Sequence, residues 1–168
     1  MTHPHRAPAH RPFNSPLEYG LRLLFVLDAA QGATCDLQRL IAYDYLLVHS
    51  GDVETGPDSL HPPVPFRGGE LLVKREVLAA GLNQMVAKEL LDRTFGVEGV
   101  GYRANDLTRA FLGLLKNSYA ADLQWRARWL IETFGTYADD ALERYMNEHV
   151  GLWGAEFDRL SALNDLEL

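Results

Sequence analysis

The chain has 168 residues, of which 47% are hydrophobic and 23% are charged. This is the ordinary composition of one globular domain, or of one domain with a helical appendage. The longest apolar run extends only from Leu23 to Leu27, far short of the roughly 18 residues that a membrane-spanning helix needs. We therefore expect neither a transporter nor a membrane anchor. Residues 1–15 lack the apolar centre of a secretory signal, and residues 1–13 are expected to form a flexible arm.

Charge is distributed unevenly along the chain, whose formal net charge is −7. Residues 1–135 hold 14 Lys and Arg against 15 Asp and Glu, whereas residues 136–168 hold 2 against 8. A nearly neutral body binds nucleic acid only through a local basic patch. Cys35 is the only cysteine, so no internal disulfide can form, and the expected compartment is the reducing cytoplasm.

The predicted elements begin with a helix in the segment SPLEYGLRLLFVLDAA. Ser15 and Glu18 have the spacing of a capping box, and Pro16 suits the first helical position. A second helix starts at Asp36 and is closed by Gly51. It is apolar nearly all round, which is typical of a helix that lies at the centre of a core or is shared between the core and a partner.

A loop rich in proline and glycine separates the second helix from a third one, predicted over Glu70 to about Glu89. Because proline restricts φ, we expect this loop to be stiff and specifically shaped. The segments LLDRTF and VGYRA then alternate around a glycine-bearing turn, which predicts a β-hairpin. Three helices followed by a hairpin is the order of elements in a winged helix-turn-helix domain, here over residues 14–116.

The remaining chain, residues 117–168, is predicted to form a helical extension that packs on this core and ends in an acidic tail. Ahead of it, a short helix after Asn105 places Leu107 and Leu114 on one apolar face. A helix from Ser118 to Phe134 and at least one more helix then follow. The predicted fold is mainly α, with a winged helix-turn-helix-like core of three helices plus a β-hairpin wing, followed by C-terminal helices.

Three polar residues are candidates for metal or acid–base chemistry: His49, Asp52 and His61. His49 and Asp52 lie three residues apart at the expected end of the second helix, a spacing that metal ligands use. No HExxH, paired-cysteine, GxSxG or phosphate-loop pattern accompanies them. A small metal-dependent hydrolase is therefore one hypothesis, and the simpler interpretation is that these side chains hydrogen-bond the backbone of the proline loop.

A DNA-binding surface is a second hypothesis. Arg103 on the hairpin, with Lys74 and Arg75 on the third helix and with Arg93 and Lys88 nearby, would supply a basic wing and helix face. Winged-helix proteins commonly bind DNA in this way. Acidic residues interleave with these bases, so the alternative is a mixed-charge solvated face that releases few counterions.

A protein-binding surface is the third hypothesis. Tyr43, Leu46 and Leu47 lie on the second helix opposite its main apolar stripe, and they are our first choice for a patch that faces a partner. Packing beneath the C-terminal helices is the alternative for the same three residues.

Several long motifs resemble one bacterial family. The segments SPLEYGLRLLFVLDAA, DLQRLIAYDYLLVHSGD, SLHPPVPFRGGELLVKR and GVGYR, with the later RARW and WGAEF, are similar to the middle component of ABC three-component systems, over about Asn14 to Phe157. The resemblance implies an accessory subunit without enzymatic activity or cofactor. Such subunits are encoded between an SMC-like ABC ATPase and an effector in bacterial phage-defence loci, and are expected to link the two.

The combined prediction is a cytoplasmic adaptor that contacts the ATPase and the effector. DNA contact through the complex and a homodimer are further options, and direct contact with DNA is left open. The alternative is a winged-helix transcriptional regulator. The expected partner-binding residues are Tyr43, Leu46, Leu47, His49, Asp52, His61 and Arg67. The residues considered for DNA contact are Lys74, Arg75 and Arg103.

Overall fold

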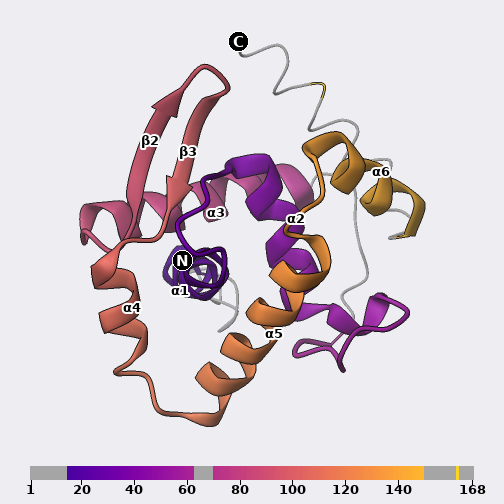
Figure 1. Ribbon diagram of the computed structural model, residues 1–168, viewed down its shortest axis with the longest axis horizontal. Coiled ribbons are helices and arrows are strands. Elements are labelled where there is room, and N and C mark those ends of the chain that lie inside the picture. The colour runs from indigo at the N-terminus through magenta and orange to yellow at the C-terminus, as the bar shows by residue number, and fades with distance from the viewer. Residues whose placement is uncertain (1–14, 63–69, 150–161, 163–168) are drawn as a thin grey trace, which may run out of the picture.

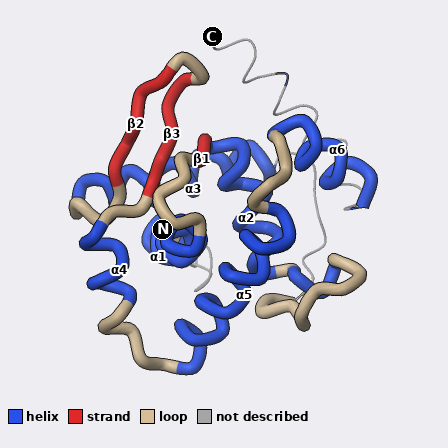
Figure 2. Tube along the Cα trace, in the orientation of Figure 1, coloured by secondary structure: helices blue, strands red, loops and turns tan. Residues whose placement is uncertain are grey.

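The computed structural model describes residues 15–62, 70–149 and 162 (Figure 1). The expected arm over residues 1–13, Arg67 and most of the acidic tail lie outside these residues. The helices are α1 (Pro16–Ala29), α2 (Leu37–Val48), α3 (Glu70–Ala87), α4 (Asp106–Leu112), α5 (Ser118–Phe134) and α6 (Asp139–His149). The strands are β1 (Cys35–Asp36), β2 (Asp92–Gly96) and β3 (Gly99–Arg103), and a 3-10 turn (Ser50–Asp52) follows α2 (Figure 2). The prediction of a mainly helical protein with one β-hairpin is therefore confirmed.

Short-range hydrogen bonds fix the starts of the helices. The Ser15 hydroxyl accepts from the backbone N–H of Glu18, and the Glu18 carboxylate accepts from that of Ser15, which confirms the predicted capping box. Asp36 caps α2 by accepting from the backbone N–H of Arg39 at 2.7 Å. These bonds satisfy amide groups that the first turn of a helix leaves without a partner.

Helices α1 and α3 cross with their backbones in contact. A Cβ atom added at Gly20 would lie 2.7 Å from the carbonyl oxygen of Gly81, and one added at Gly81 would lie 2.3 Å from that of Pro16. Only glycine allows the two helices to approach so closely at this point. Gly81 therefore does not interrupt α3, and its position in the middle of the helix has a packing reason.

The sheet has three antiparallel strands in the order β1-β3-β2. The strand β1, which the sequence did not predict, pairs only Cys35 with Tyr102 and Asp36 with Gly101. In contrast, β2 and β3 pair along all five of their residues. The outer half of the hairpin extends beyond β1 and projects away from the helices (Figure 1).

The C-terminal helices complete the core, because α5 packs against α1 and α2, and α6 packs against α2. Helix α5 has the predicted bounds. Helix α4 differs from the expectation, because it ends at Leu112 and its buried residues are Thr108 and Leu112. Leu107 in the helix and Leu114 beyond its end are 51% and 76% exposed, whereas Phe111 and Leu115 pack against the core. Within the described ranges, no helix combines the length and apolar character needed to cross a membrane.

Candidate protein–protein interface

The structure places Tyr43, Leu46 and Leu47 in the interior rather than on an exposed patch, so that expectation is wrong. All three are buried to at least 99%. Helix α2 packs against α1, α3, α5 and α6. Its apolar side chains are therefore covered by other helices of the same chain. The Tyr43 hydroxyl lies 3.5 Å from the carbonyl oxygen of Phe134 on α5, which confirms the alternative of packing beneath the C-terminal helices for this residue.

A buried ion-pair cluster occupies the contact of α1, α2 and α3. Arg22 donates from Nε and NH2 to the two carboxylate oxygens of Asp44 at 2.9 and 3.1 Å, and Lys74 Nζ lies 3.3 Å from Asp44 Oδ2. Burial alone would raise the pKa of Asp44, but the charges of Arg22 and Lys74 hold it below its usual value. Lys74 is therefore an internal ion-pair partner and does not form part of an exposed basic face.

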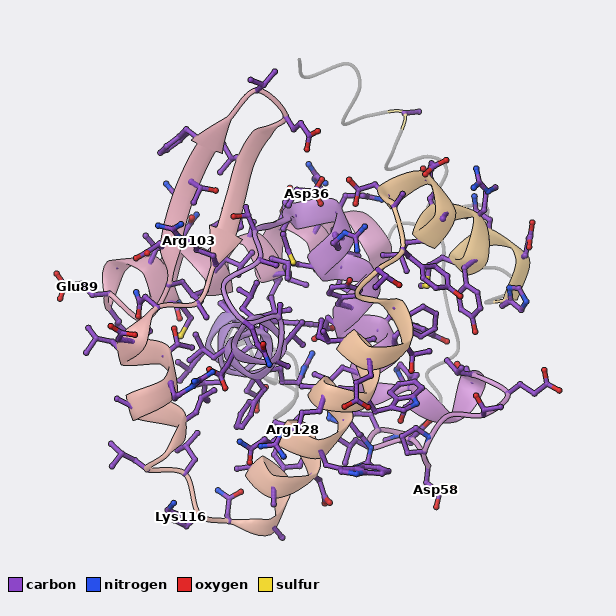
Figure 3. All side chains as sticks on the ribbon, viewed as in Figure 1. Asp36, Asp58, Glu89, Arg103, Lys116 and Arg128 are labelled. Carbon is purple, nitrogen blue, oxygen red and sulfur yellow. The ribbon has the colours of Figure 1, made fainter. Side chains whose placement is uncertain are left out.

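The other candidate DNA contacts are also interleaved with polar partners. Arg103 lies at the base of the hairpin (Figure 3), with its Nε 3.4 Å from the Asp92 carboxylate. Arg93 donates to the Asn83 side chain and stacks over the Tyr102 ring. Arg75 is half-buried. This part of the described surface is of mixed charge and does not gather into a basic patch.

The three candidate metal or acid–base residues join the loop to the helices. The His49 ring packs against Tyr45, whose hydroxyl donates to the Asp52 carboxylate. His61 Nε2 lies 2.9 Å from the Tyr119 hydroxyl on α5. Burial lowers the pKa of His49, and it lowers that of His61 to about 4. Across residues 15–62 and 70–149, no three His, Cys, Asp or Glu side chains are grouped so that they could hold a metal ion.

In residues 49–62 the loop after α2 is held by hydrogen bonds, while the rest of the proline- and glycine-rich loop lies outside the described residues, so its predicted stiffness stays a prediction. The backbone N–H groups of Leu60 and His61 both donate to the carbonyl oxygen of Val48. Arg126, a buried residue of α5, donates from Nε and NH2 to the carbonyl oxygen of Asp58 at 3.1 and 2.7 Å. The sequence did not reveal the role of Arg126, because its partner lies 68 residues away along the chain.

The outer half of the hairpin has two different faces. Phe95 pairs with Val100 across the strands, and side chains alternate between the faces of a sheet. On one face Phe95 and Val100 are 78% and 44% exposed, and Val97 in the adjoining turn is fully exposed. Monomeric proteins seldom leave apolar side chains grouped in solvent unless they bind something there. We call Phe95, Val97 and Val100 the apolar hairpin face, which the sequence analysis did not single out.

The opposite face of the hairpin borders an open groove of about 1080 Å³. This face carries Thr94, Gly96, Gly99 and Gly101. The lining also includes Phe95, Val97 and Val100 of the apolar hairpin face and Glu98 in the hairpin turn. The rest comes from the connection between α1 and β1, the start of α2, and the end of α5 with the turn that follows it. We call this space the hairpin groove.

The described chain is thus a mainly helical protein with six helices and a small three-stranded antiparallel sheet. A family model, the ABC-three component (ABC-3C) system Middle Component 2, matches residues 12–156. The chain belongs to this family, which confirms the resemblance inferred from its motifs, and membership of a three-component system implies partner components. No curated protein and no solved structure gave a significant match.

Proposed function

We propose that the protein is a non-enzymatic adaptor that links the SMC-like ABC ATPase of its three-component system to the effector, in bacterial phage defence. Family membership supports the presence of partner components. The observation that carries the proposal is the cross-strand pair of Phe95 and Val100, whose side chains are 78% and 44% exposed on a projecting hairpin. Uncovered apolar side chains of this kind supply the centre of protein interfaces.

We also propose that residues 14–116, the predicted core, contain a winged-helix unit. The order of its elements, α1-β1-α2-α3-β2-β3, and the sheet order β1-β3-β2 support this assignment. In DNA-binding relatives of this architecture, basic side chains on the helix and wing meet phosphates. Here Lys74 is engaged with the buried Asp44 and Arg103 lies beside Asp92, which favours a protein-binding use of the wing over a DNA-binding regulator.

Co-purification with the ATPase and effector components tests the adaptor function. The variant is Phe95→Ser combined with Val100→Ser, and the matched control is Leu114→Ser, which changes an equally exposed apolar residue outside the hairpin. We expect the wild type and the control to retain both components, and the hairpin variant to bind one of them at least tenfold more weakly at an unchanged melting temperature.

A wild-type protein that binds neither component would contradict the adaptor function. A hairpin variant that binds both components as tightly as the wild type does would contradict the apolar hairpin face as the interface. If the isolated protein instead shifts duplex DNA at physiological salt with a steep dependence on salt concentration, the regulator hypothesis replaces the adaptor.

A further inference from the structure

We propose that the hairpin groove binds an extended, basic segment of a partner protein. This inference rests on the proposed adaptor function and deepens it, because it assigns a ligand chemistry to the groove beside the hairpin. The groove volume of about 1080 Å³ slightly exceeds the roughly 300–1,000 Å³ typical of small-molecule sites. An open space of this size beside a strand suits a length of peptide better than a compact metabolite.

The hairpin wall of the groove exposes main chain. Gly101 is required by the fold itself, because a Cβ atom there would lie 2.2 Å from Cγ2 of Thr34. Gly96 is the last residue of β2, directly before the hairpin turn, and no contact requires a glycine there: its φ is not positive and an added Cβ would meet nothing within 4 Å. A strand residue without a side chain leaves room for another backbone to approach closely. Gly96 leaves that approach open to a ligand.

The edge of β3 is also open toward the tip of the hairpin. On the β1 side, β3 is paired only at Tyr102 and Gly101, because the chain enters α2 directly after Asp36. Val100 and Gly99 therefore have β2 on one side and no described strand on the other. An extended segment that continues the line of β1 can hydrogen-bond to this main chain, as in other complexes formed by strand addition.

The charge of the lining selects a basic segment. Its charged residues are Asp36, Glu98, Asp139 and Arg39, with a formal sum of −2. Arg39 is already engaged, because its Nε lies 2.7 Å from Asp139 Oδ1 and its NH1 lies 2.7 Å from the Tyr43 hydroxyl. Asp36 stands at the start of α2 beside the hairpin (Figure 3), where its Oδ1 caps the helix and its second carboxylate oxygen can attract Lys or Arg. Glu98 in the hairpin turn adds a second carboxylate.

The same charges disfavour other occupants. A nucleic acid would bring phosphates against three carboxylates, which costs energy instead of releasing counterions. A second copy of this chain, with its formal net charge of −7, offers an acidic surface on average. A Lys- or Arg-bearing segment with apolar residues at alternate positions is complementary to both the carboxylates and the main-chain wall.

The test uses the full chain and two synthetic eight-residue peptides, one alternating Lys with Val and one alternating Glu with Val. Binding is followed by titration of the isotopically labelled protein with amide NMR shifts as the readout. We expect the Lys peptide to shift the amides of Thr34, Gly96 and Gly99, and the Glu peptide to bind at least tenfold more weakly. Gly96→Val should weaken binding of the Lys peptide at least tenfold, because the new side chain occupies the groove. Its melting temperature should stay unchanged, because the side chain enters open space. Leu107→Ser, a change on exposed α4, is the control and should bind as the wild type does.

The groove assignment is overturned if the Lys peptide does not bind, if the Glu peptide binds equally well, or if Gly96→Val binds the Lys peptide as tightly as the wild type. Full-length components separate this failure from failure of the adaptor function. If the ATPase and effector both bind Gly96→Val normally, the adaptor function stands and the groove assignment falls. If neither binds the wild type, the adaptor function itself falls, and with it the assignment of a partner segment.

Discussion

The interior around α1 and α2 and the outer half of the hairpin use apolar side chains in opposite ways. Leu24 and Leu46 are fully buried among other helices, whereas Phe95 is largely in solvent. The interior also encloses the ion pairs of Asp44, and the hairpin tip contains no comparable cluster among the described residues. Side chains of the interior therefore determine stability, while those of the hairpin tip can be changed with little effect on folding. This contrast can be measured as free energies of unfolding.

The largest loss is expected from Asp44→Ala. The variant leaves Arg22 and Lys74 buried beside each other without their shared counterion. Removing one partner of a buried pair costs about 3–5 kcal/mol. Chemical denaturation should show this loss for Asp44→Ala, whereas Asp140→Ala, which removes an exposed pair with Arg144, should change the free energy by less than about 1 kcal/mol. Equal losses in the two variants would contradict the role of the buried cluster.

A smaller loss is expected from Gly81→Ala. The new methyl group would overlap the carbonyl oxygen of Pro16, and α1 and α3 must move apart to admit it. Overpacking of this kind costs about 1–3 kcal/mol, which exceeds the gain of up to about 1 kcal/mol in helix propensity. Thermal unfolding measures the effect. Gly96→Ala is the control, since its Cβ meets nothing, and stabilisation by Gly81→Ala would contradict the close crossing.

The pH dependence of stability should reveal His61. Its pKa is lowered to about 4 in the folded protein, against about 6.5 in an unfolded chain. Between these values the unfolded chain binds the proton and the folded chain does not, so stability is complete above pH 6.5 and falls as the pH drops toward 4. Unfolding of the wild type and of His61→Gln, compared at pH 8 and pH 5, should show a weaker pH dependence in the variant. An unchanged pH dependence would contradict the neutral state of the half-buried His61.

The smallest effect is expected at the hairpin. Phe95→Ser changes a side chain that is mostly in solvent, so the free energy of unfolding should stay within about 0.5 kcal/mol of the wild-type value. Leu24→Ala, which empties a fully buried site, should cost about 2–5 kcal/mol in the same denaturation experiment. A loss for Phe95→Ser as large as that for Leu24→Ala would mean that the hairpin tip is part of the core.

Local signals allowed much of the fold to be predicted. The capping box of Ser15 and Glu18 and the bounds of α5 depend on residues a few positions apart, and the structure confirms them. The two-residue strand β1 escaped prediction because Cys35 and Asp36 are extended only through pairing with β3, more than 60 residues later. The face of α4 was ambiguous for a similar reason, since Leu107 and Leu114 form a regular apolar stripe that the packing leaves exposed.

The candidate interface could not be located from residue patterns. The apolar pattern of Tyr43, Leu46 and Leu47 is the same whether another helix of this chain or a partner protein packs against them. In this structure, α5 and α6 pack against α2 and the three residues are buried. Conversely, the alternation around Phe95 and Val100 predicts a half-buried hairpin, and only its projection past β1 leaves the apolar side in solvent.

The helices, the hairpin and the membership of the middle-component family could be inferred from the amino-acid sequence. Capping residues, turn glycines and family motifs involve residues that are close together along the chain. The tertiary structure alone decided that Lys74 turns inward to Asp44 and that the hairpin exposes one apolar face and one groove. The physical reason is that burial depends on which elements cross and where each strand ends, and those contacts join residues that are far apart along the chain.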